Sequence, residues 1–224
     1  FAIDEESIAK RIEFVRITVD DRANMKALIP WIEEHSASFA KGIYDWQFSF
    51  SQTKAFFDQY AEKKKMRVLA LREHLEKMQD KFLRECFYGA EEGWGRDYIN
   101  SRLKIGKVHD MINLPLKWFI GAYSEIQQLI RKRLFVSFSP DIALVYEQSI
   151  LKILNLDIQT ICDCFLMSTF ESIGFDISGV ETGRGKDKTE KVSQIKENLN
   201  LLFQQADALC KGDYEDKSLA KQLE

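Results

Sequence analysis

A chain of 224 residues in which 45% are hydrophobic and 30% are charged has the composition of a soluble globular protein, with room for one large domain or for one domain with an appendage. The net charge of -3 gives no reason to expect a polyanionic partner, so nucleic-acid binding is disfavoured. No run approaches the roughly 20 uncharged apolar residues of a membrane span, and the acidic first residues are unlike a signal peptide, so we expect a cytoplasmic protein.

Long helices are expected from the first residues onward, because the chain has only three prolines and no alternating apolar and polar run of strand length. Three side chains typical of helix N-caps mark the first helix starts, Asp20, Asp21 and Ser36. The helix after the aspartates would carry Leu28 and Ile32, and the helix after the serine would carry Phe39 to Phe50.

Three further apolar stripes at helical spacing follow along the chain. The first, on a helix that ends near Gly89, consists of Val68, Leu71, Leu75, Met78 and Phe82. The second follows Pro115 and consists of Leu116, Phe119, Tyr123 and Ile130. The third consists of Leu151, Leu154, Ile158, Ile161 and Phe165. Together these helices predict an all-α fold of about seven or eight helices in residues 1–173, the number expected of a globin-type packing.

The composition changes after residue 173. Residues 174–188 are rich in Gly, Ser, Thr and Asp, which is typical of a linker. Residues 189–224 then carry an apolar series that alternates steps of three and four, Val192, Ile195, Leu199, Leu202, Ala206 and Leu209. This segment is either a signalling helix of coiled-coil type or an amphipathic helix that folds back on the globular domain. Because the chain starts at Phe1 and not at Met, and ends within a helical pattern, we expect both ends to be excised from a longer protein.

Few residues are available for chemistry. The three histidines, His35, His74 and His109, form no pair at zinc-binding spacing. The sequence contains neither a phosphate-binding glycine loop nor a nucleophile and base signature, so we do not expect an enzyme within these residues. The four cysteines are too few for a disulfide scaffold in a chain of this length and are expected to be reduced.

His109 and Tyr44 are the candidate functional side chains. The helical neighbours of His109 are Ile105 and Ile112, so its imidazole projects from an apolar face. It is either a core histidine satisfied by a backbone carbonyl or a metal ligand, since neutral imidazole binds haem iron well. Tyr44 lies on a helix that is apolar almost all round, so it is either a tyrosine at the edge of the core or a functional donor.

One segment carries a family resemblance. Residues 98–123, YINSRLKIGKVHDMINLPLKWFIGAY, resemble the proximal region of the globin-coupled sensors and protoglobins. Two other stretches resemble the second and last helices of that family, Pro30 to Tyr44 and Leu151 to Phe165 with Leu156-Asp157. Two positions depart from the family pattern: Asn113 replaces the glycine of an Ile-Gly-Leu corner, and Phe119 replaces a frequent tyrosine.

The resemblance implies a globin fold that binds haem b, with His109 as the proximal iron ligand and Tyr44 as a distal hydrogen-bond donor to a diatomic gas. It implies a pocket that includes Ile105, Ile112, Leu114, Phe119 and Leu75. His74 is a possible distal ligand, although the charged residues on its helix face favour a surface position. The lysine run Lys63-Lys64-Lys65 is interpreted as a solvated face.

The same resemblance implies a haem-based gas sensor, with O2 as the first choice of ligand and CO or NO as alternatives. In this family the last two globin helices form a homodimer interface. The signal would pass through it to an output domain such as a chemotaxis transducer, a diguanylate cyclase or a kinase. Two alternatives stay open, a haem-free interaction scaffold and a protoglobin-like enzyme with reactivity at an open iron.

Overall fold

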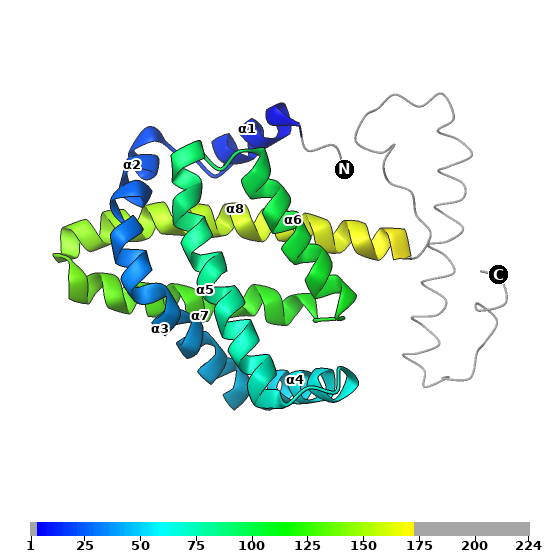
Figure 1. Ribbon diagram of the computed structural model, residues 1–224. Coiled ribbons are helices and arrows are strands. Elements are labelled where there is room, and N and C mark those ends of the chain that lie inside the picture. Colours follow the sequence, from blue (N-terminus) through cyan, green and yellow to red (C-terminus); the bar gives the residue numbers. More distant parts are fainter. Residues whose placement is uncertain (1–3, 173–224) are drawn as a thin grey trace, which may run out of the picture. The chain divides into compact units, whose positions relative to one another are not determined.

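The structure, a computed structural model, describes residues 4–172, which are all-helical with no strand in that range (Figure 1). The eight helices are α1 (Glu5–Phe14), α2 (Val19–Ala27), α3 (Ile29–Ser49), α4 (Ser51–Lys63), α5 (Val68–Glu92), α6 (Arg96–Met111), α7 (Leu116–Ser137) and α8 (Pro140–Ser172). The all-α prediction and its helix number are confirmed. The expected linker at 174–188 and signalling helix at 189–224 lie outside the described residues.

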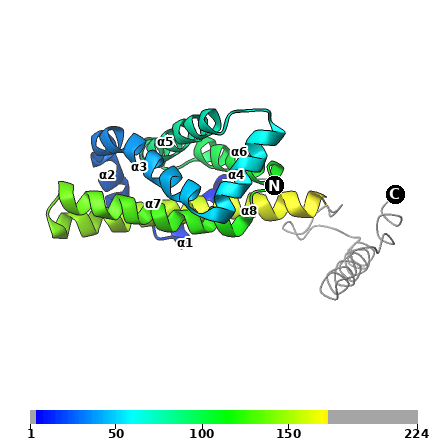
Figure 2. The same ribbon diagram turned by 90° about the horizontal axis from the view of Figure 1, so that it is seen from below.

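The helices form two layers, in which α7 and α8 run antiparallel and side by side, and α3, α5 and α6 cross them on one face (Figures 1 and 2). The main core lies between these layers. Its fully buried members include Ile32 of α3, Leu83 and Phe87 of α5, Leu134 of α7 and Ile153 of α8. None of the helices described in residues 4–172 is long and apolar enough to cross a membrane.

The starts of α2 and α3 differ from the sequence prediction. Asp21 does belong to a helix start, but the N-cap is Thr18, which exchanges hydrogen bonds with Asp21 in a capping box. Ser36 was wrongly predicted as a start, because α3 passes through it without a break. The Ser36 hydroxyl donates to Asp80 of α5 instead of capping its own helix, and Pro30 occupies the first turn of α3.

The apolar stripe predicted for α5 is only partly buried. Leu71 is buried, but Val68 and Met78 have 38% and 50% of their surface exposed. The core-facing side is continued in the second half of α5 by Leu83 and Phe87, where the helix packs on α2 and α3. The apolar stripe of one helix predicts which face of the helix is buried, but not which part of the helix a neighbouring helix covers.

A smaller aromatic cluster is separate from the main core and joins α3, α4 and α5. Its buried members are Phe57, Ala61 and Leu71, and its partly buried members are Tyr44, Phe48, Phe56, Tyr60 and Leu75. Because Tyr44 belongs to this cluster, the functional candidates of the sequence are divided between two apolar regions.

α6 approaches α8 closely at Gly106. A Cβ atom at this position would lie 2.6 Å from the Cβ of Cys164 and 3.1 Å from the carbonyl oxygen of Ile161. Only glycine permits this approach, since real Cβ atoms do not come so near to another helix. This close contact with α8 fixes the position of α6 at Gly106, three residues before His109.

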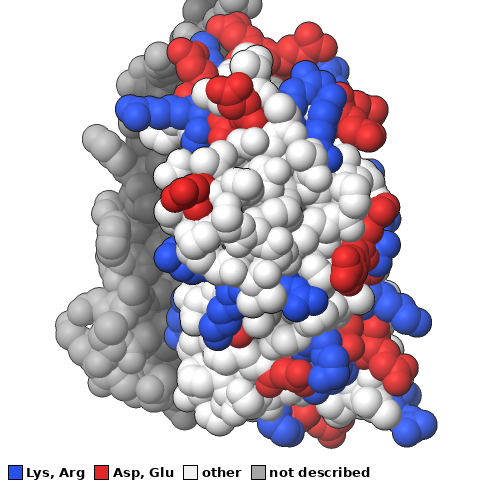
Figure 3. All heavy atoms as spheres, turned by 90° about the vertical axis from the view of Figure 1, so that its left-hand side faces the viewer, with Lys and Arg blue, Asp and Glu red and all other residues white. Residues whose placement is uncertain are grey.

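The corner between α7 and α8 exposes apolar side chains. Val136, Ile142 and Val145 are all exposed there, and the charged pair Arg131 and Glu147 links the two helices nearby at 2.8 Å. Figure 3 views this end of the molecule, and the centre of the face carries few charged side chains. An exposed apolar face of this kind is typical of an interaction surface.

Candidate functional site

His109 lies in the last turn of α6, and its ring is oriented by its own helix. Its Nδ1 lies 2.8 Å from the carbonyl oxygen of Ile105. Since a carbonyl can only accept a hydrogen bond, Nδ1 carries the proton and Nε2 keeps its lone pair. Nε2 has no hydrogen-bond partner among the described residues. The two interpretations of His109 are therefore compatible, because the carbonyl satisfies one nitrogen and leaves the other able to bind a metal.

The surroundings of His109 are aromatic. The ring centroids of Phe119 and Phe165 lie 5.3 and 6.3 Å from that of the imidazole. Burial lowers the pKa of His109, and the Ile105 carbonyl opposes this effect without reversing it. The imidazole is therefore neutral near pH 7, which is the form that binds metals. Phe119 was predicted to lie here, whereas Phe165 had been assigned only to an apolar stripe of α8.

Asn113 closes the end of α6 in the left-handed conformation, with φ of 56°. Its N–H donates to the carbonyl of Asp110 at 2.8 Å, and the N–H of Leu114 donates to the carbonyl of His109 at 3.0 Å, which together form a Schellman motif. Asparagine tolerates this backbone better than other residues with a Cβ. The substitution of the family's glycine therefore keeps the geometry of the corner next to His109.

Tyr44 projects from α3 into the aromatic cluster. Its ring contacts Phe57 and Phe48, at centroid distances of 6.1 and 6.4 Å, and Leu75 of α5 belongs to the same cluster. Burial, with Glu76 adding a negative charge nearby, raises the pKa of Tyr44 above its ordinary value, so the phenol stays protonated. Within the described residues its hydroxyl has no hydrogen-bond partner, and its proton is available to a ligand.

A cavity of about 440 Å³ opens between the second half of α4 and the end of α6. Its walls come from Phe56, Gln59, Tyr60, Lys63, Lys64, Val108, Met111, Ile112 and Asn113. The volume lies in the range of small-molecule and cofactor sites. Two of its walls, Phe56 and Tyr60, also belong to the aromatic cluster of Tyr44.

The predicted pocket residues are only partly brought together. Ile112 lines the cavity, and Leu75 lies with Tyr44 in the aromatic cluster. The others, Ile105, Leu114 and Phe119, pack in the main core on the His109 side. His74 is exposed on α5, so its position gives no support to distal ligation.

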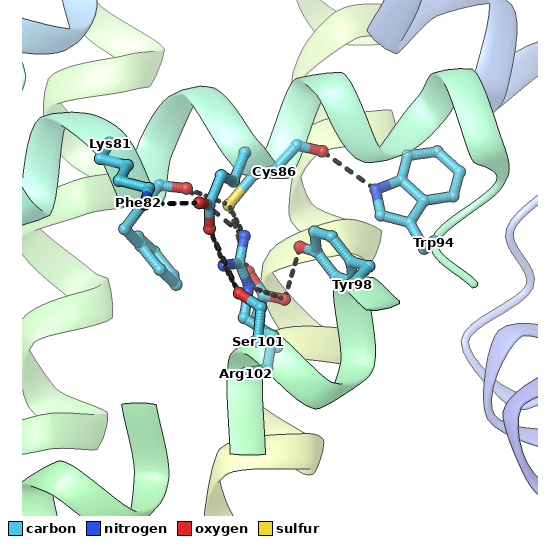
Figure 4. A network of polar contacts seen from close by, with 9 residues as sticks. Lys81, Phe82, Cys86, Trp94, Tyr98, Ser101 and Arg102 are labelled. Carbon is cyan, nitrogen blue, oxygen red and sulfur yellow. Dashed lines mark hydrogen bonds and ion pairs between the residues drawn. The ribbon is translucent and has the colours of Figure 1, made fainter. Parts of the chain in front are cut away.

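Behind the His109 helix, a buried polar network links α5, α6 and α8 (Figure 4). Arg102 and Asp157 are both fully buried, and Arg102 Nε donates to Asp157 Oδ1 at 3.1 Å. The same carboxylate accepts from the Tyr98 hydroxyl at 2.6 Å and from the Cys86 thiol at 3.2 Å, and Arg102 also donates to Glu85 at 2.8 Å. Tyr98, Arg102 and Asp157 lie in the segments that resemble the family, but the sequence did not predict that their side chains interact.

Aromatic rings enclose the Arg102 guanidinium, whose central carbon lies 4.5 Å from the Phe82 centroid and 4.2 Å from the Tyr98 centroid. The surrounding negative groups hold the pKa of Arg102 above its ordinary value although burial opposes this. Burial raises the pKa of Tyr98, and the Asp157 charge raises it further. The network therefore holds a charged arginine in the interior, where the cost of desolvation is offset by several partners.

Tyr123 of α7 also lies in this interior. Its hydroxyl is buried and has no hydrogen-bond partner among the described residues. Its ring lies 5.4 Å from that of Phe119, which in turn contacts His109. A buried hydroxyl without a partner costs about 1–3 kcal/mol and indicates a water or ligand that would satisfy it. Three polar groups thus lack a partner among the described residues, the Tyr44 hydroxyl in the aromatic cluster and, on the side of Phe119, the Tyr123 hydroxyl and His109 Nε2.

Comparison with known proteins points to one family. A family profile described as Protoglobin matches residues 4–169. The heme-based aerotactic transducer HemAT of Halobacterium salinarum is 29% identical over 122 residues, which are 54% of this chain and 23% of that protein. The chain therefore spans less than a quarter of that relative's length.

Among solved structures, the globin domain of a Geobacter sulfurreducens globin-coupled sensor superposes with a TM-score of 0.59 at 18% identity, over 70% of this chain and 96% of that one. This likeness confirms the globin fold of the eight helices. The profile match covers most of the chain and confirms the resemblance seen in residues 98–123. The chain therefore belongs to the protoglobin family.

Proposed function

We propose that residues 1–173 form the haem b-binding domain of a gas sensor, with His109 as the proximal iron ligand and O2 as the sensed gas. The observation that carries the proposal is the free Nε2 of an imidazole whose Nδ1–H is held by the Ile105 carbonyl in aromatic surroundings. The Halobacterium relative is a heme-based aerotactic transducer, which supports the same class of function.

Haem iron with a single imidazole ligand supplies an open coordination position for O2, CO or NO. His109 would hold the iron, and the Nδ1–H bond to Ile105 fixes its ring orientation and makes Nε2 more basic. Phe119 and Phe165, whose rings lie beside the imidazole, would keep water from the nitrogen that binds the iron. On the other side, the Tyr44 hydroxyl would donate a hydrogen bond to the gas, while Phe57 and Leu75 keep its surroundings apolar.

Three ties between α6 and α8 support a route for the signal. Arg102 pairs with Asp157, Gly106 packs on Cys164, and Asp110 accepts a hydrogen bond from Ser168. Since these ties occur on successive turns of the helix that carries His109, a shift of α6 would be transmitted to α8. We propose that α7 and α8 also form the homodimer interface, which the exposed apolar residues at their corner support.

The whole protein would then be a cytoplasmic homodimer that reports gas binding to an output module. A chemotaxis transducer is the output suggested by the Halobacterium relative, and a diguanylate cyclase or a kinase is an alternative. We propose that the output module follows the linker at 174–188 and the helix at 189–224. No catalytic role is proposed for residues 1–173.

Reconstitution with haem tests the proposal. We expect the wild-type chain to show a Soret band and H109A to lose it, with H74A as the matched control that keeps the band because His74 is exposed. Equal haem retention by H109A would show that another residue holds the iron. Absence of a Soret band from haem-replete wild-type protein would favour the haem-free interaction scaffold.

A further inference from the structure

The cavity between α4 and the end of α6 is lined by both apolar and cationic side chains. Its apolar lining includes Phe56 and Ile112, which are half-buried, and Val108, which is exposed. Its polar lining consists of Lys63 and Lys64 with the amides Gln59 and Asn113, and no aspartate or glutamate contributes to the wall. Because Lys63 and Lys64 are exposed, they form a cationic rim, and a cavity with such a rim and an apolar lining fits a ligand that has an apolar body and carboxylates at one edge.

The two lysines on this rim have no acidic partner. Within the described residues neither Lys63 nor Lys64 forms an ion pair, whereas Lys54 on the same helix pairs with Asp58 at 2.5 Å. Lys64 Nζ instead lies 5.8 Å from the centroid of the Tyr60 ring, which is itself part of the cavity wall. The lysine charge therefore lies at the cavity, and no acidic side chain of the described residues neutralises it.

The backbone holds these lysines at the rim. α4 ends at Lys63, and Lys65 adopts the left-handed conformation with φ of 54°. The N–H groups of Lys65 and Met66 close the helix end by donating to the carbonyls of Glu62 and Ala61, each at 2.9 Å. Lysines are also favoured at helix C-termini because their charge interacts favourably with the helix dipole. That preference does not explain why these two lysines line a cavity.

We propose that Lys63 and Lys64 bind the two carboxylates of the haem at this rim. The inference rests on the proposed function, because haem b is the carboxylate-bearing ligand that function supplies. It assigns a binding role to a lysine run that the sequence alone presented as a solvated face. Each lysine forms a charge-assisted pair with a carboxylate while its stem covers apolar surface.

The test measures haem release from the reconstituted protein to an excess of apomyoglobin. We expect K63Q/K64Q to release haem about two- to fivefold faster for each lysine removed, the effect of a partly exposed ion pair. The variant K63R/K64R keeps both charges and should release haem at the wild-type rate. K54Q is the control on the same helix and should also match the wild type, because Lys54 does not line the cavity.

Haem dimethyl ester, which lacks the two charges, separates a carboxylate contact from a general loosening of the fold. We expect the wild type and K63Q/K64Q to release the ester at equal rates. Unchanged release of haem b by K63Q/K64Q, or equal acceleration with haem b and with the ester, would overturn the assignment of the lysines alone. A wild-type protein with no Soret band would overturn the proposed function and this assignment with it.

Discussion

Arg102 of α6 and Asp157 of α8 form an ion pair at 3.1 Å in which both side chains are fully buried. Removal of one partner leaves the other charge uncompensated in the interior. We expect R102M to lower the free energy of unfolding by about 3–5 kcal/mol, measured by urea denaturation of the haem-free protein.

The pair between Arg131 and Glu147, which is exposed on the arginine side, provides the control for Arg102. Arg131 is more than half exposed, so R131M should cost less than about 1 kcal/mol. If R102M and R131M lost similar amounts of unfolding free energy, burial would not make the Arg102 pair more important for stability than an exposed pair.

The sequence predicted the elements of the fold better than their partners. Pro115 correctly marks the start of α7, since proline suits the residues that open a helix. Ser36 was misread because the hydroxyl that resembles an N-cap binds Asp80, 44 residues further along the chain. A local pattern contains no information about such a long-range contact.

The same limit applies to the site. The apolar neighbours of His109 could be read from helical spacing, and the structure adds the Ile105 carbonyl that selects its tautomer. The Arg102 and Asp157 pair spans 55 residues, and neither residue is unusual in its own helix. The lysine run at Lys63 and Lys64 is exposed, as predicted, but only the fold places it on a cavity.

Asn113 should tolerate glycine and reject β-branched residues. Its φ of 56° suits glycine, whereas valine is strained there, so N113V should lose about 1–2 kcal/mol of unfolding free energy while N113G changes little. Thermal or urea unfolding measures both. A loss in N113G equal to that in N113V would mean that the asparagine side chain, not its backbone conformation, stabilises the corner after α6.

Asp21 should make stability depend on acid pH. Burial alone would raise the pKa of Asp21, but hydrogen bonds from Lys152, Thr18 and Ser149 outweigh it and hold the pKa below its ordinary value. The stabilisation is therefore complete above the unfolded pKa of about 4 and is lost as pH falls through the lower folded pKa.

The variant D21N measures this contribution. We expect it to lose about 2 kcal/mol of unfolding free energy at pH 7, and the difference from wild type to shrink below about pH 4. D20N, in the same helical turn but exposed, should show neither effect. A D21N deficit that stays constant down to pH 2 would contradict the ionic origin of the stabilisation.

Tyr44 and Tyr123 both present hydroxyls without a partner in the described residues, and kinetics can decide which one contacts the gas. If Tyr44 donates to O2, Y44F should speed O2 dissociation about tenfold, the value of one hydrogen bond of roughly 1.4 kcal/mol. CO dissociation should change much less, because bound CO carries little negative charge on its outer atom. Y123F removes a similar hydroxyl on the side of Phe119 and should leave both rates near wild type. Equal acceleration of both gases in Y44F would point to a change in pocket shape, and an O2 effect confined to Y123F would assign the donor to α7.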